Sequence, residues 1–157
     1  MRTIKFNIFP PPPILEREVE CFSLVEYSGD EALTIKVAPK AVPGLVFQHN
    51  EGHSALESIL TPSGSLSPAP GLFVYKAGIT PSVMHFTKGS YTTLQVIFKP
   101  HALNSLFGLD ASSPSLSRGF MALEEFSGGA LKEQLLEVKD RQEQIALLER
   151  RLAELGA

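Results

Sequence analysis

The chain has 157 residues, of which 43% are hydrophobic and 20% are charged. This length suits one domain with its own core and is short for two. The formal net charge is −3, and the densest basic run, Lys139 to Arg151, is interspersed with Asp140, Glu143 and Glu149. Because binding to a nucleic-acid backbone requires a basic surface, we expect no DNA-binding surface within this chain.

The single cysteine, Cys21, excludes an intramolecular disulfide and a structural zinc site built from several thiolates. It lies in an apolar stretch, so we interpret it as a small buried residue. No apolar run approaches the ~20 residues that cross a bilayer. A run of four prolines at residues 10–13 also interrupts any signal-like segment. We therefore expect a soluble, cytoplasmic protein without a membrane partner.

The first 100 residues alternate between short runs rich in Val, Ile, Phe, Tyr and Thr and clusters of Gly, Pro, Asn and Ser. This pattern predicts many short strands joined by turns. No helical segments alternate with the strands, so the pattern favours a sandwich or a closed barrel over a parallel sheet. Strands are expected at residues 2–9, 20–27, 33–37, 44–50, 54–60, 72–77, 82–87 and 92–98. Residues 62–71 are expected to form a surface loop or flap.

After Pro100 the pattern becomes helical. Residues 101–107 carry one apolar stripe, which begins after Pro100 and ends at Gly108. Residues 112–126 are expected to link the helices through short helical turns. A second helix is expected at 130–138. The fold class is therefore mostly β with C-terminal helices (α+β): residues 1–100 form the barrel, and residues 101–157 form a helical segment packed on it within a single structural domain.

The last expected helix runs from Asp140, which forms a capping box with Glu143, to Leu155. Its apolar stripe consists of Ile145, Leu148, Leu152 and Leu155. The stripe has two interpretations that the sequence leaves open. It packs on the chain's own barrel, or it forms a dimer with a second copy.

The histidines His49 and His53, with Glu57 four residues further on, are the candidate metal ligands. Asn50 and Gly52 indicate a hairpin turn whose tip the two histidines flank. The spacing matches neither a His-x-His pair on one strand nor a helical His-Glu-x-x-His motif. We interpret the two as surface hairpin histidines and predict no metal site.

Five residues of the expected strands are candidates for lining a ligand site: Phe47, Tyr75, His85, Tyr91 and Gln95. His85 lies in the middle of its strand, where its side chain lines a cavity or is an ordinary outward-facing or core histidine. No nucleophile elbow and no Gly-rich phosphate loop occurs, and no carboxylate pair lies in the strands. We therefore predict no catalytic residues, no cofactor and no enzymatic activity.

Several short motifs resemble a known group of proteins. They are Val42-Pro43-Gly44-Leu45-Val46-Phe47, Val74-Tyr75-Lys76-Ala77-Gly78, Leu94-Gln95-Val96-Ile97-Phe98-Lys99-Pro100 and Leu106-Phe107-Gly108. In this order they resemble the N-terminal domain of bacterial AraC-type transcription regulators, in which a cupin-like domain precedes a paired helix-turn-helix DNA-binding domain. The resemblance implies a cupin-like β-barrel that senses a small-molecule effector, followed by a small helical bundle that connects and dimerises. It also implies a DNA-binding domain after Leu155 that is absent from this chain.

Three functions follow from these observations. The first is the sensing and homodimerisation domain of an AraC-type regulator. The second is a free-standing cupin-type enzyme, motivated by the barrel and the four histidines. The third is a protein-interaction module without a small ligand, in which the helices present Leu131, Leu135, Ile145 and Leu148 to a partner. We expect the first.

Overall fold

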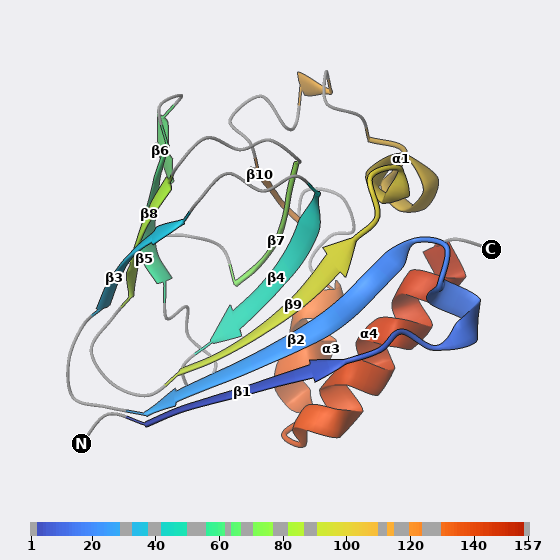
Figure 1. Ribbon diagram of the computed structural model, residues 1–157, viewed down its shortest axis with the longest axis horizontal. Helices are drawn as coiled ribbons and strands as arrows, with labels where there is room; N and C mark the ends of the chain where they lie inside the picture. The colour runs from blue at the N-terminus through green and yellow to red at the C-terminus, as the bar shows by residue number, and fades with distance from the viewer. Residues whose placement is uncertain are drawn as a thin grey trace.

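The computed structural model describes residues 3–28, 33–37, 42–49, 56–61, 64–66, 71–76, 82–86, 91–109, 113–114, 120–123 and 130–155. Within these ranges the strands form two antiparallel sheets, which we name sheet A and sheet B (Figure 1). Sheet A has the strand order β1-β2-β9-β4-β7-β10. Its strands are β1 (Thr3–Phe9), β2 (Val19–Ser28), β4 (Gly44–His49), β7 (Leu72–Tyr75), β9 (Tyr91–Phe98) and β10 (Phe120–Ala122).

Sheet B has the strand order β3-β8-β5-β6. Its strands are β3 (Leu33–Val37), β5 (Leu56–Thr61), β6 (Gly64–Leu66) and β8 (Ser82–Phe86). For these four strands the structure describes the backbone and the register, not the side chains. Within the described ranges no strand of sheet A pairs with a strand of sheet B, so the arrangement there is one of two facing sheets.

The helices in the described part of the chain are η1 (Pro13–Leu15), a short 3-10 turn, and three α-helices, α1 (Ala102–Phe107), α3 (Ala130–Glu137) and α4 (Arg141–Leu155). Helix α1 ends at Gly108, whose φ of 67° is a left-handed conformation that glycine adopts without a Cβ penalty. Asp140 directly precedes α4 and caps it. Its Oδ1 accepts hydrogen bonds from the backbone N–H of Gln142 at 2.7 Å and of Glu143 at 3.4 Å. This side-chain cap satisfies two of the N–H groups that a helix start leaves free.

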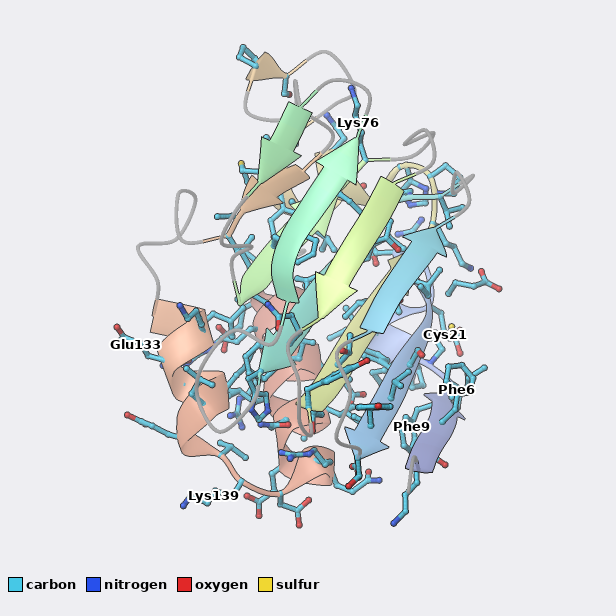
Figure 2. The ribbon with its side chains drawn as sticks, turned by 90° about the vertical axis from the view of Figure 1, so that its left-hand side faces the viewer. Phe6, Phe9, Cys21, Lys76, Glu133 and Lys139 are labelled. Carbon is cyan, nitrogen blue, oxygen red and sulfur yellow. The ribbon has the colours of Figure 1, made fainter. Side chains whose placement is uncertain are left out.

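The molecule has three layers. In Figure 1 helices α3 and α4 lie on one side of sheet A and sheet B lies on the other side. Figure 2, turned by 90°, shows sheet B in front, with sheet A and the helices behind it. Neighbouring residues along a strand point to opposite faces, so sheet A has a helix face and an inner face, the second turned towards sheet B.

The largest hydrophobic core lies between the helix face and the helices. Its strand residues include Phe22, Leu94 and Phe47, each at most 1% exposed. Its helix residues include Leu148 and Leu152, both 0% exposed. Full burial of each such side chain contributes about 1.5–3 kcal/mol, so this interface contributes strongly to the stability of the fold.

The structure confirms a mostly antiparallel β protein with C-terminal helices. Each of the eight expected strands is present, with ends that differ by at most two residues. Two strands were not expected: β6 lies in the stretch 62–71 that was predicted to be a loop, and β10 replaces part of the helical turns predicted for 112–126. Both are three residues long, too short for an alternating pattern to reveal them. Pairing with the directly preceding strand β5 forms β6, and pairing with β7, which is distant in sequence, forms β10.

Candidate functional site

The inner face of sheet A is the candidate site. The strand register assigns its members, because residues directly opposite each other in a ladder share a face. The described residues of this face are Phe6 and Ile8 on β1, Cys21, Ser23, Val25 and Tyr27 on β2, Tyr91, Thr93, Gln95 and Ile97 on β9, Gly44, Val46 and Gln48 on β4, Phe73 and Tyr75 on β7, and Ala122 on β10. None of these residues is Asp, Glu, Lys or Arg.

Two hydroxyl groups on this face are buried without a hydrogen-bond partner in the described part of the chain. They are the phenol oxygen of Tyr75 and Oγ1 of Thr93. Tyr75 is 5% exposed and Thr93 is 7% exposed. A buried polar group without a partner costs about 1–3 kcal/mol, and few native groups are left in this state. Both hydroxyls therefore have unused hydrogen-bonding capacity within the described part of the chain.

Tyr75 reaches its position because it stands opposite Gly44 in the ladder between β7 and β4. A Cβ atom at Gly44 would overlap the hydroxyl oxygen and Cζ of Tyr75 and lie 2.7 Å from its Cε1. The missing side chain of Gly44 thus leaves the space in which the Tyr75 ring lies across the neighbouring strand. Gly44 therefore contributes to the site by leaving room for the Tyr75 ring.

The tyrosines of the inner face are neutral donors. Burial, with a smaller contribution from Cys21, raises the pKa of Tyr75 to about 12. At the far end of β9 the rings of Tyr91 and Tyr27 stack with centroids 4.9 Å apart, and burial together with Tyr27 raises the pKa of Tyr91 to about 12. Both phenols therefore keep their proton near pH 7, and the face offers hydroxyl groups, amides and aromatic rings instead of charges.

Three of the five expected ligand residues, Tyr75, Tyr91 and Gln95, lie on the inner face, with Tyr91 and Tyr75 towards opposite ends of it and Gln95 between them. Phe47 lies on the opposite face: it is paired with Leu94 and belongs to the core under the helices. His85 lies in β8, where its Cα pairs with Thr34 and Ser58, and its side chain is outside the described residues.

Sequence reasoning missed Thr93 and Gly44. The signal for Thr93 was present, since it alternates in phase with Tyr91 and Gln95 on the same strand. Nothing in the sequence marked Gly44, because its role depends on which residue the neighbouring strand places opposite it.

The prediction that His49 flanks the tip of a surface hairpin is wrong. Strand β4, which ends at His49, pairs with β7 and β9, whereas the next strand, β5, belongs to sheet B. The two strands are therefore not the arms of one hairpin. Residues 50–55, which include His53, and the side chain of Glu57 lie outside the described residues.

The imidazole of His49 lies on the helix face with its ring 5.1 Å from that of Phe47. Nδ1 and Nε2 are both buried, and neither has a hydrogen-bond partner among the described residues. Burial, and secondly the positive charge of Arg141, lower the pKa of His49. Arg141 itself forms an ion pair with Glu26, at 3.7 Å.

The predicted dimerisation stripe is packed inside the chain. Ile145, Leu148 and Leu152 are 5%, 0% and 0% exposed, and all three belong to the core beneath sheet A. Leu155 is 38% exposed. Of the two interpretations of this stripe, packing on the chain's own sheet is the one that the structure shows. Leu131 and Leu135, proposed as partner-binding residues, are also buried.

Within the described residues no three His, Cys, Asp or Glu side chains come together in a way that could hold a metal ion. Within the same residues no helix has the length and apolar composition needed to span a membrane.

The fold and this face define a class of two-sheet antiparallel β protein that carries a neutral, polar inner surface and a helical layer on its other side. Residues 7–114 match the family model described as "Domain of unknown function (DUF6597)". The chain belongs to this family. No curated protein matches the chain.

Among solved structures, the chain is similar to a cupin domain from Bordetella pertussis Tohama I, with a TM-score of 0.38, 11% identity, and coverage of 63% of this chain and 92% of that chain. It is similar to the EutQ protein of Clostridium difficile, with a TM-score of 0.39, 7% identity, and coverage of 63% and 70%. It is also similar to ToxT from Vibrio cholerae with an unsaturated fatty acid bound, with a TM-score of 0.40, 9% identity, and coverage of 98% of this chain and 52% of ToxT.

Proposed function

We propose that this chain is the ligand-sensing domain of a cytoplasmic transcription regulator of the AraC type. In this proposal sheets A and B form a cupin-like barrel and a small-molecule effector binds between them. The observation that carries the proposal is the pair of buried, unpartnered hydroxyls of Tyr75 and Thr93 on the inner face. Unpaired groups of this kind lower the stability of the free protein and stabilise a complex with a ligand that pairs them.

Sheet A links the proposed ligand site to the helices directly. On β9, Thr93 points to the inner face, and the next residue, Leu94, points into the core that contains Leu148 of α4. A ligand that shifts β9 therefore moves side chains that support α4. Helix α4 is the last described element, so it is the element through which we propose that binding is transmitted to a helix-turn-helix domain beyond this chain.

The regulator proposal includes a homodimer. Because Ile145, Leu148 and Leu152 are buried, a second copy has to contact other residues unless α4 rearranges. The most exposed large apolar side chains among the described residues are Ile14, Ile8 and Phe6, which are 70%, 61% and 59% exposed. Figure 2 shows Phe6 at the β1 edge of the molecule, away from Glu133 on α3.

The proposal is tested by thermal unfolding of the chain in the presence of a library of neutral and charged metabolites. A ligand that binds only the folded state raises the unfolding temperature by mass action. We expect at least one compound to do so, with the shift reduced in Thr93→Val and retained in Thr92→Val. Thr92 is the matched control because it neighbours Thr93 on β9 and lies on the helix face. A library without any stabilising compound would contradict the proposal, and turnover of the bound compound would favour the enzyme alternative.

A further inference from the structure

We propose that the inner face binds an uncharged, elongated molecule with an apolar middle and an oxygen atom at each end. This inference rests on the proposed function, because it names the class of effector that the same site takes. It is built from three features of the described residues: the absence of charge, the positions of the two unpartnered hydroxyls, and the residues between those positions.

The described side chains of the inner face supply no charge that could pair with a buried anion or cation. A carboxylate or ammonium group that leaves water for a low-dielectric site requires an opposite charge or several strong hydrogen bonds. The described inner-face residues include no Asp, Glu, Lys or Arg. The phenols of Tyr75 and Tyr91 do not supply a negative charge, since burial raises their pKa to about 12.

The two hydroxyls lie towards opposite ends of β4. The Tyr75 hydroxyl lies where a side chain of Gly44 would begin, and Thr93 stands opposite Gln48 in the ladder. Gly44 and Gln48 are four residues apart on one strand, which corresponds to about 13 Å at about 3.3 Å per residue. One molecule that reaches both hydroxyls therefore has an extended shape.

Between the hydroxyls the inner face is apolar on the side of β4 and β7, whereas Gln95 on β9 is the polar neighbour of Val46. Val46 lies midway between Gly44 and Gln48, is paired with Phe73 on β7, and both are buried, at 4% and 1% exposure. Each end of the row thus offers an O–H donor, and the side of the centre formed by Val46 and Phe73 offers hydrocarbon. A ligand that matches this sequence has oxygen acceptors, such as hydroxyl, ketone or ester groups, at both ends of an apolar chain or ring system.

The test compares three probes of equal carbon length with the folded 157-residue chain: 1,10-decanediol, its dicarboxylate counterpart sebacate, and 1-decanol. Binding is measured by saturation-transfer NMR and titration calorimetry. We expect the diol to bind more tightly than 1-decanol, and sebacate to bind at least tenfold more weakly than the diol. Loss of one neutral hydrogen bond corresponds to about a three- to tenfold rise in the dissociation constant. We expect that rise for the diol in both Tyr75→Phe and Thr93→Val, and no change in Thr92→Val.

Each other outcome shows whether the inference about the ligand fails alone or together with the proposed sensor function. Sebacate binding as tightly as the diol would overturn the inference and leave the sensor function standing. A library compound that stabilises the chain in a Thr93-dependent way, while the diol does not bind, would also overturn the inference alone. Diol binding that is equal in the wild type, Tyr75→Phe and Thr93→Val would place the ligand elsewhere and overturn it. Absence of binding by the diol and by every library compound would overturn the inference and the proposed function together.

Discussion

Sheet A buries side chains on both of its faces, and the two faces differ in kind. The helix face packs leucines, valines and phenylalanines against α1, α3 and α4 in one continuous core. The inner face buries Tyr75, Thr93, Gln48 and Ser23 among a few apolar residues. A strand such as β9 serves both faces through alternate residues. The helix face therefore contributes apolar burial to stability, whereas the inner face keeps unpartnered polar groups at a cost in stability. Under the proposed function these groups pair with the effector.

The largest expected effect is on the helix face. Leu148→Ala removes a side chain that is 0% exposed, and a cavity in a packed core lowers the free energy of unfolding by about 2–5 kcal/mol. Leu155→Ala, at a position that is 38% exposed, is the control, with an expected loss below about 1 kcal/mol. Chemical denaturation measures both. An effect at Leu148 that disappears on dilution would place the stripe in a dimer interface instead, because stabilisation by a second copy falls with concentration.

The next effect concerns the space beside Gly44. Gly44→Ala forces the ring of Tyr75 to move, because the new Cβ would overlap its hydroxyl and Cζ. We expect a loss of about 1–3 kcal/mol, together with weaker binding of any ligand that contacts Tyr75. In the control, Gly71→Ala, the nearest atom to the new Cβ is Cε of Lys132, at 3.4 Å, so little change is expected. Equal unfolding free energies for the two variants would contradict the close approach of Tyr75 to β4.

The smallest effect is a pH dependence from His49, a polar residue on the helix face. Its pKa is lowered in the folded state, so the unfolded chain binds a proton more readily. Stability from this residue is present above the ordinary histidine pKa of about 6.5 and is lost as the pH falls towards the folded value. We expect the wild type to lose a few more degrees of unfolding temperature between about pH 7.5 and pH 5.5 than His49→Leu does.

His101→Gln is the control for this measurement, because His101 is exposed at the start of α1. It should follow the wild type. Identical pH profiles for the wild type and His49→Leu would show that His49 is not held neutral by burial.

The sequence predicted the strands well because alternation and turn residues are local signals. It could not assign the faces of β4. Gly44 to Gln48 are all buried, whichever side they face. No contrast between polar and apolar residues along β4 therefore distinguishes the inner face from the helix face. Phe47 was therefore placed with Tyr75, although the docking of the helices puts it on the other face.

The amphipathic stripe of the last helix shows the same limit. Its spacing predicted α4 and its Asp140 cap, because periodicity and capping depend on nearby residues. Whether Leu148 meets its own sheet or a second copy depends on tertiary packing that a hydrophobic stripe does not encode.

The most direct test of the account is the free energy of unfolding of the double variant Tyr75→Phe/Thr93→Val without ligand. The variant removes two hydroxyls that have no partner in the described structure and keeps the shape of both side chains. If the inner face retains these groups for binding, the variant will be as stable as the wild type or more stable by about 1–2 kcal/mol. A loss of more than about 1 kcal/mol would show that the hydroxyls stabilise the fold and would contradict the assignment of this face to function.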